Sequence, residues 1–275
     1  MTTLAELRHQ VKELRLENAA LKEGKPCIDL IYPNVEKYVQ WDEMKYSLRS
    51  VEKNLVDVEF RVWIVGDRPE WLSDQANFID VPCSGKTTRV DQAMKRIAVD
   101  NHKEINEVYF WMNDDIYFIN PVTYADLCIP KILEDLKGRL NKYNPQTQWG
   151  RDMIDTFNRL KVEQLPTLNY AIHLPYMYEK TKSKELFRLF DLEKKSYVFE
   201  NLYYNLFYPH LIPYTLGLEE TNNLLFCVNR PNPNWDILGR QLKAKKFMNN
   251  SEAGMTDQFK TLLQSLFPEK SRFEK

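Results

Sequence analysis

Two adjacent aspartates follow a continuous apolar run in the middle of the chain. Asp114 and Asp115 come after the run 108–112 and Asn113, and a second apolar run, 116–119, follows them. Continuous β-branched and aromatic residues are typical of a strand covered on both faces, as in a parallel sheet flanked by helices. We therefore expect a buried strand that delivers two carboxylates at its end.

Such a pair of carboxylates predicts a divalent cation. Ionised carboxylates are costly to bury unless a cation neutralises them, and their hard oxygens suit Mn²⁺ or Mg²⁺. Open α/β sheets bind ligands beyond the carboxyl ends of their strands. We predict that Asp114 and Asp115 hold this metal ion, with Asn113 beside them at the bound ligand. An acidic turn without a ligand is the alternative interpretation.

The whole chain has the composition of a globular protein. It has 275 residues, of which 43% are hydrophobic and 13% aromatic, and its net charge is −1, so no overall field favours nucleic acid or an anionic membrane. Its four cysteines form no CxxC pair, which fits reduced thiols. No apolar run is long enough to span a bilayer and no signal peptide is visible, so we expect a soluble cytoplasmic protein.

The first 24 residues have the pattern of a separate coiled-coil helix. Leucine occupies positions 7, 14 and 21, while Val11 and Asn18 occupy the alternate heptad positions. Leucine at d with asparagine at a is typical of parallel pairing. Residues 3–23 therefore predict a homodimer, and the alternative is an amphipathic arm that packs back on its own domain.

From residue 27 onward, short apolar strands alternate with helices. The expected strands are 28–32, 60–65, 78–82 and 108–112, and the expected helices are 41–55 and 89–99. This alternation implies right-handed βαβ units and an α/β fold with a mostly parallel, Rossmann-like sheet flanked by helices. The absence of a GxGxxG or Walker A motif argues against dinucleotide oxidoreductases and P-loop ATPases.

Later segments are expected to complete the same domain. We predict helices at 131–143 and 152–162, a strand at 167–173, and a buried helix within 197–208, where apolar residues recur at helical spacing.

A strand and helix series that ends in an Asp-rich triplet resembles the nucleotide-sugar half of GT-A glycosyltransferases. More closely, residues 41–54, 61–72 and 112–115 resemble the second motif block of the Stealth sugar-1-phosphate transferases, with weaker similarity at 173–176 and 259–269. The resemblance implies a nucleotide-sugar-binding half over 27–120 and an acceptor half over 121–275. It also implies a metal-dependent transferase that uses a nucleotide-diphosphate sugar such as a UDP-sugar.

The resemblance leaves several functions open. The first Stealth block carries Asp-Gly-x-Asp after its strand, where this chain has Tyr-Pro-Asn-Val-Glu at 32–36, so glycosyl transfer ranks ahead of sugar-1-phosphate transfer. The acceptor is expected to be a glycan or, because compact phage proteins look similar, a modified phage DNA base. A binding protein without catalytic activity on the same fold is the remaining alternative.

Four further residues are assigned to the expected site. His173 is a candidate base for the acceptor hydroxyl or a metal ligand, and Arg89 is a candidate cation for the donor phosphates. Tyr32 and Asp67 follow the first two strands and are candidate contacts for the nucleoside, by stacking and by hydrogen bonds. Asp115 is the residue on which catalysis is expected to depend most, because it lies where leaving-group charge develops.

Overall fold

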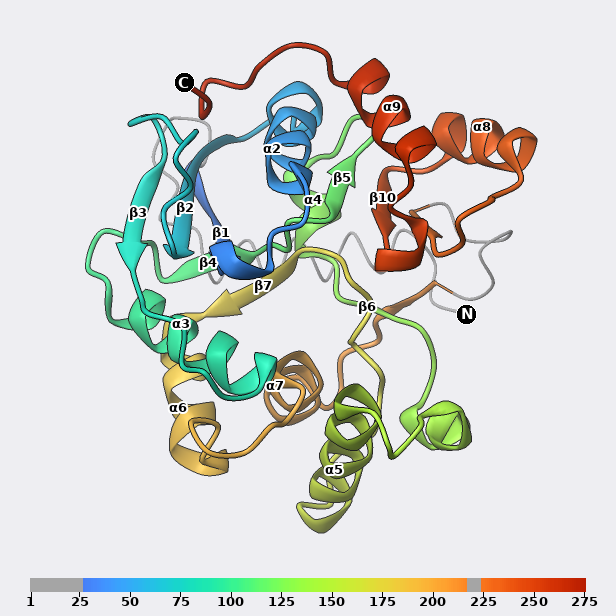
Figure 1. Cartoon of the computed structure of the whole chain (residues 1–275). Helices are drawn as coiled ribbons and strands as arrows, with labels where there is room; N and C mark the ends of the chain where they lie inside the picture. The colour runs from blue at the N-terminus through green and yellow to red at the C-terminus, as the bar shows by residue number, and fades with distance from the viewer. Residues whose placement is uncertain (1–26, 217–223) are drawn as a thin grey trace.

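The structure is a computed structural model that describes residues 27–216 and 224–275. A five-stranded sheet in the order β3-β2-β1-β4-β7 forms its centre (Figure 1). The strands are β1 (Cys27–Asn34), β2 (Glu59–Gly66), β3 (Asn77–Asp80), β4 (Val108–Trp111) and β7 (Tyr176–Glu179). The first four run parallel and β7 is antiparallel to β4. The prediction of a mostly parallel α/β sheet is confirmed.

The remaining strands form two smaller sheets. One joins β5 (Ile116–Phe118), β10 (Phe247–Asn250) and β9 (Leu225–Val228), and the other pairs β6 (Lys131–Ile132) with β8 (Tyr214–Thr215). The eight α-helices of the described residues are α2 (Glu43–Asn54), α3 (Thr88–Asn101), α4 (Tyr124–Cys128), α5 (Gln148–Val162), α6 (Lys180–Phe190), α7 (Phe199–Phe207), α8 (Trp235–Ala244) and α9 (Asp257–Leu266). Short 3-10 helices occur at Glu36–Tyr38, Leu136–Lys142 and Glu252–Gly254.

Helices cover both faces of the five-stranded sheet. Helix α2 lies on one side, whereas α3, α6 and α7 lie on the other (Figure 1). Leu48 and Val51 of α2 are buried completely, as are most side chains of β1, β2 and β4. Burial on both faces explains why these strands are mostly apolar.

The direction in which strands are added reverses beside β1. The chain adds β2 and β3 on one side of β1 and then crosses over, so that β4 joins its other side. Ile31 pairs with Trp111, and the Met112 N–H donates to the Ile31 carbonyl at 2.8 Å. The triplet 113–115 therefore leaves β4 next to the end of β1, where doubly wound sheets form a crevice.

Two predicted elements are wrong. Residues 131–143 form β6 and a 3-10 helix in place of an α-helix, because Lys131 pairs with Tyr214, far along the chain. Residues 167–173 form no strand, because their backbone bonds to side chains of α7: the Tyr170 N–H donates to Asn201 at 2.7 Å and the Leu168 N–H to Asn205 at 3.0 Å. The predicted buried helix within 197–208 is confirmed as α7.

Other predictions concern the ends and the halves of the chain. The expected coiled coil at 3–23 lies outside the described residues. No helix in the described ranges is long and apolar enough to cross a membrane. One hydrophobic core contains residues from both 27–120 and 121–275.

Candidate active site

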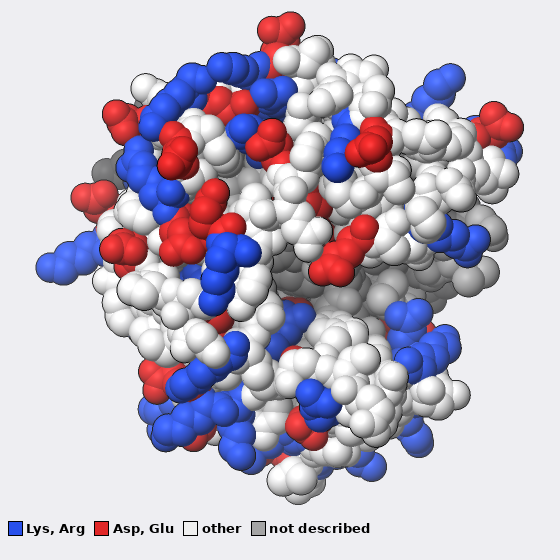
Figure 2. Space-filling view, in the orientation of Figure 1, with Lys and Arg blue, Asp and Glu red and all other residues white. Residues whose placement is uncertain are grey.

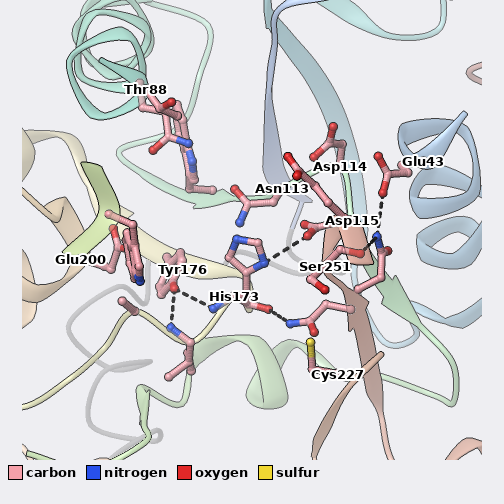
Figure 3. Close-up of a pocket in the computed structure, with 18 of the residues that line it drawn as sticks. Glu43, Thr88, Asn113, Asp114, Asp115, His173, Tyr176, Glu200, Cys227 and Ser251 are labelled. Carbon is pink, nitrogen blue, oxygen red and sulfur yellow. Dashed lines mark hydrogen bonds and ion pairs between the residues drawn. The ribbon is translucent and has the colours of Figure 1, made fainter. Parts of the chain in front are cut away.

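A cavity of about 650 Å³ opens at the carboxyl end of β4. Its wall is formed by the triplet 113–115, the start of α3, residues 171–176 and the end of β10. Figure 3 shows Asp114, Asp115 and Glu43 on one side of the cavity, Thr88 and Glu200 on the other, and His173 between them. In the space-filling view this face of the molecule is hollowed near its centre, with acidic and basic side chains around it (Figure 2). A cavity of this size is in the usual range for small-ligand sites.

The acidic side of the cavity carries three carboxyl groups. Burial, with the neighbouring Asp115 and Glu43 carboxylates, raises the pKa of Asp114 well above its ordinary range. Burial also raises the pKa of Glu43, whose Oε1 accepts a hydrogen bond from Asn250 at 2.8 Å. Because each negative charge disfavours the others, this side of the cavity favours a bound cation.

The two carboxylate oxygens of Asp115 have different surroundings. Its side chain is 14% exposed, and one carboxylate oxygen, Oδ2, lies 3.1 Å from His173 Nδ1. The other oxygen, Oδ1, is buried and has no hydrogen-bond partner among the described residues. A buried carboxylate oxygen without a donor is costly, and a ligand that supplies positive charge would remove that cost.

Three contacts hold His173 in the cavity, two through its backbone and one through its ring. Its backbone has φ of 54°, a left-handed conformation that is uncommon outside glycine. Its N–H donates to the Tyr176 hydroxyl at 3.1 Å and its carbonyl accepts from Asn249 Nδ2 at 2.9 Å. The surrounding cavity wall partly desolvates the imidazole and lowers the pKa of His173, but the Asp115 carboxylate raises it by more, so the net shift is upward. The imidazole, 56% exposed, remains accessible to a substrate.

Cationic side chains from α3 form the opposite side of the cavity. Thr87 caps the helix by accepting from the Val90 N–H, and Arg89 lies in the first turn. The Arg89 guanidinium is 4.8 Å from the ring centroid of Trp149, and its Nη1 is 4.0 Å from Glu200 Oε1. Arg96, two turns further along the helix, also lines the cavity.

The structure brings most of the sequence-predicted residues together. Asn113, Asp114, Asp115, Arg89 and His173 all line this one cavity.

Tyr32 and Asp67 are corrections to the sequence-based assignment. The Tyr32 ring is fully buried and its hydroxyl bonds to Ser47 at 3.1 Å, so the ring offers no face to a nucleoside. Asp67 does not line the cavity, because its Oδ2 accepts from the Glu36 N–H at 2.8 Å and fixes the loop after β1. Both residues support the strand ends that position the site.

Most residues of the wall were not predicted from the sequence, among them Glu43, Arg96, Trp111 and Asn249. Glu43 falls within the motif block 41–54 and Trp111 lies in the apolar run 108–112 before the triplet, so both belong to segments that the sequence had already singled out. Arg96 and Asn249 carry no sequence signal, because only the fold brings them to the cavity.

The oxygens around Asp115 fit a divalent cation of the Mg²⁺ or Mn²⁺ type. Among the described residues, no three His, Cys, Asp or Glu side chains converge as a ligand set. Mg²⁺ is commonly bound by only one or two carboxylates together with substrate phosphates. Asp115 Oδ1 and Asn249 Oδ1 are both buried and have no hydrogen-bond partner within residues 27–216 and 224–275, so they supply hard oxygens of the right kind beside Asp114.

Comparison with known proteins adds a local sequence similarity. No protein-family model matches the chain. Over 102 residues, 34% of its length, the chain is 30% identical to an exopolysaccharide phosphotransferase of Streptomyces coelicolor, and it spans 17% of that protein. A crystal structure of an active-site mutant of LgtC covers 89% of this chain and 98% of its own, with 13% identity and a TM-score of 0.49.

Proposed function

We propose that this protein is a transferase that uses a nucleotide-diphosphate sugar and a divalent cation to glycosylate a carbohydrate. The observation that carries the proposal is the meeting of Asp114, Asp115 and His173 in one cavity at the carboxyl end of β4. This arrangement combines a site for a cation, and hence for a diphosphate, with a group that can accept a proton. The GT-A-like character of the fold is part of the proposal.

Asp114 and Asp115 would hold Mn²⁺ or Mg²⁺, with Asn113 at the donor. When bound, the cation offsets the negative charge that develops on the leaving diphosphate. The chain itself supplies a pre-formed acidic turn, because Met112 is fixed to β1 by its backbone hydrogen bond. Arg89 faces the same cavity and would add a second positive charge toward the substrates.

His173 would receive the proton of the acceptor hydroxyl. Its Nδ1 lies against Asp115, so Nδ1 carries the proton and Nε2 is the basic nitrogen. The two backbone contacts from Tyr176 and Asn249 fix the position of residue 173 and so limit the directions that the ring can take. Such orientation of a base is worth typically 10²–10⁴-fold in rate.

Calorimetric titration with UDP tests the donor assignment. We expect binding in the presence of MnCl₂ and a loss of at least about tenfold in affinity when EDTA replaces the metal. Equal affinity in the two solutions would remove the metal from the proposal. A panel of UDP-sugars with glycan and modified-DNA acceptors would then identify the reaction, and binding without turnover on the whole panel would favour a non-catalytic binding protein.

Sugar-1-phosphate transfer is the second candidate. It is favoured by the 30% identity with an exopolysaccharide phosphotransferase over 102 residues. The two reactions share a donor and differ in the bond that breaks, so a donor labelled in the phosphate next to the sugar separates them. Label retained in the nucleotide product indicates glycosyl transfer, and label found in the sugar product indicates phosphosugar transfer.

A further inference from the structure

Arg96 is a buried cation on the cavity wall, and its nearest buried carboxyl along the helix, Asp100, acts on it only at a distance. Its side chain is 2% exposed and lines the cavity from α3. Among the described residues it forms no ion pair, and its Nε has no hydrogen-bond partner. Buried charges in proteins are normally paired or bound to a ligand. An anion bound in the cavity would therefore supply Arg96 with the hydrogen-bond acceptor that it lacks among the described residues.

A second unpaired donor lies against it. The Arg96 guanidinium carbon is 4.1 Å from the ring centroid of Trp111 and 4.3 Å from that of Phe199. Trp111 also lines the cavity, and its indole Nε1 is buried without a partner in the described part of the chain. The two rings fix the guanidinium by cation–π contact, but they supply no hydrogen-bond acceptor. Arg96 Nε and Trp111 Nε1 are thus two neighbouring hydrogen-bond donors that have no acceptor among the described residues.

The charges around the cavity separate into two regions. Glu200 lies 4.0 Å from Arg89 and balances that arginine, whereas Arg96 forms no ion pair with a described residue. The opposite side carries Glu43, Asp114 and Asp115. An anion that enters without a metal ion is repelled by the three acids and attracted by Arg96. The α3 side is therefore a binding region of its own.

We propose that Arg96 and Trp111, with Arg89 beside them, bind an anionic group on the carbohydrate that reacts, a carboxylate or a phosphate monoester. A guanidinium presents its donors as a planar fork that suits these groups. The diphosphate of the donor belongs with the cation on the acidic side, so this second anion lies on a sugar. The description of that sugar as a substrate rests on the proposed function, whereas the anion site stands on the two unpaired donors. The protein would thus select acidic over neutral sugars.

Titrations of the full chain, followed by tryptophan fluorescence, test this site. The probes are glucuronate, glucose 6-phosphate and glucose, with UDP plus MnCl₂ as a separate ligand. We expect at least one of the two acidic sugars to bind more than about tenfold tighter than glucose, because hydrogen bonds to charged groups are worth about that factor or more. The stronger of the two identifies the anion as a carboxylate or a phosphate.

Variants of Arg96 separate the anion site from the donor site. Arg96→Met should weaken binding of the preferred acidic sugar at least tenfold and leave UDP binding unchanged, and Arg96→Lys should give an intermediate loss because the fork is absent. Arg159→Met is the matched control, since Arg159 also stacks on a ring, Phe190 at 5.1 Å, but does not line this cavity. Thermal melting establishes that each variant is folded.

Several results would overturn the site. Binding of glucose as tight as that of both acidic sugars would show that Arg96 does not bind an anionic sugar. Unchanged binding of the acidic sugars to Arg96→Met would show the same. An equal loss of UDP binding in Arg96→Met would assign Arg96 to the donor diphosphate. If UDP fails to bind the unaltered protein while an acidic sugar binds, the proposed function fails and the anion site stands. If neither Arg96 variant folds, the preference of the unaltered protein for acidic sugars decides.

Discussion

His173 Nδ1 lies 3.1 Å from Asp115 Oδ2, which joins a loop of the second half of the chain to the acidic turn after β4. Both residues line the same cavity, and no other described residue bonds to the Asp115 carboxylate. It also sets the orientation of the imidazole, with Nε2 available to a substrate.

Replacement of His173 by alanine should slow transfer by about 10² or more with little loss of stability. The reason is that the side chain is more than half exposed, so its removal deletes a base and little packing. Measurement of kcat/KM with a saturating metal concentration gives the result. His210→Ala, an exposed histidine outside the cavity, is the control. Unchanged turnover in His173→Ala would make His173 a structural residue.

The buried Asp100 carboxyl should make the stability of the protein depend on pH, without involving Asp115 or His173. Asp100 is 2% exposed, and burial raises the pKa of its carboxyl from 3.8 to about 6, although Ser183 and Tyr109 donate to it. The folded state therefore takes up a proton before the unfolded state as pH falls from about 7, so unfolding becomes harder by about 2 kcal/mol by the time pH reaches about 4.

The Asp100→Asn variant isolates this effect. We expect the free energy of unfolding, measured by urea denaturation, to increase in the unaltered protein relative to Asp100→Asn as the pH is lowered from 7.5 to 4.5. The variant should be no less stable at pH 7.5, because an amide oxygen still accepts from Tyr109. Parallel pH profiles for the two proteins would contradict the raised pKa.

Residues 3–23 should drive dimerisation, because leucine occupies positions 7, 14 and 21 and Asn18 an a position. Light scattering should report twice the monomer mass for the full chain and the monomer mass for a chain that begins at Lys25. Leu14→Lys offers a milder disruption of the same seam. An unchanged mass in both cases would leave this segment without a role in association.

The sequence predicts the parts of the fold that depend on local pattern. Strands β1, β2 and β4 are mostly apolar, and α2 and α3 have helical periodicity, so their positions follow from the pattern of apolar residues. The triplet 113–115 is predictable for the same reason, since polar residues that follow a buried strand must lie at its end.

Other features depend on partners far along the chain. Residues 131–143 become strand and 3-10 helix because β8 pairs with them, and residues 167–173 are held by asparagines of α7. Tyr32 appeared to be a nucleoside contact because it ends an apolar strand, but α2 covers it. Arg96 shows the opposite case: a cation in an amphipathic helix is expected in solvent, and only the rings of Trp111 and Phe199 explain its burial.

The most direct test of the account is the Asp115→Asn variant, measured for both activity and stability. Asp115 Oδ1 has no partner in the described structure and its charge opposes those of Asp114 and Glu43, so its removal should leave the melting temperature of the metal-free protein unchanged or raised. Activity should fall by about 10²–10³, because the same change deletes an anionic ligand where leaving-group charge appears. Asp74→Asn, a fully exposed aspartate away from the cavity, should change neither quantity. A large fall in melting temperature, with full activity in the fraction that stays folded, would show that Asp115 is a structural turn residue and would contradict the account.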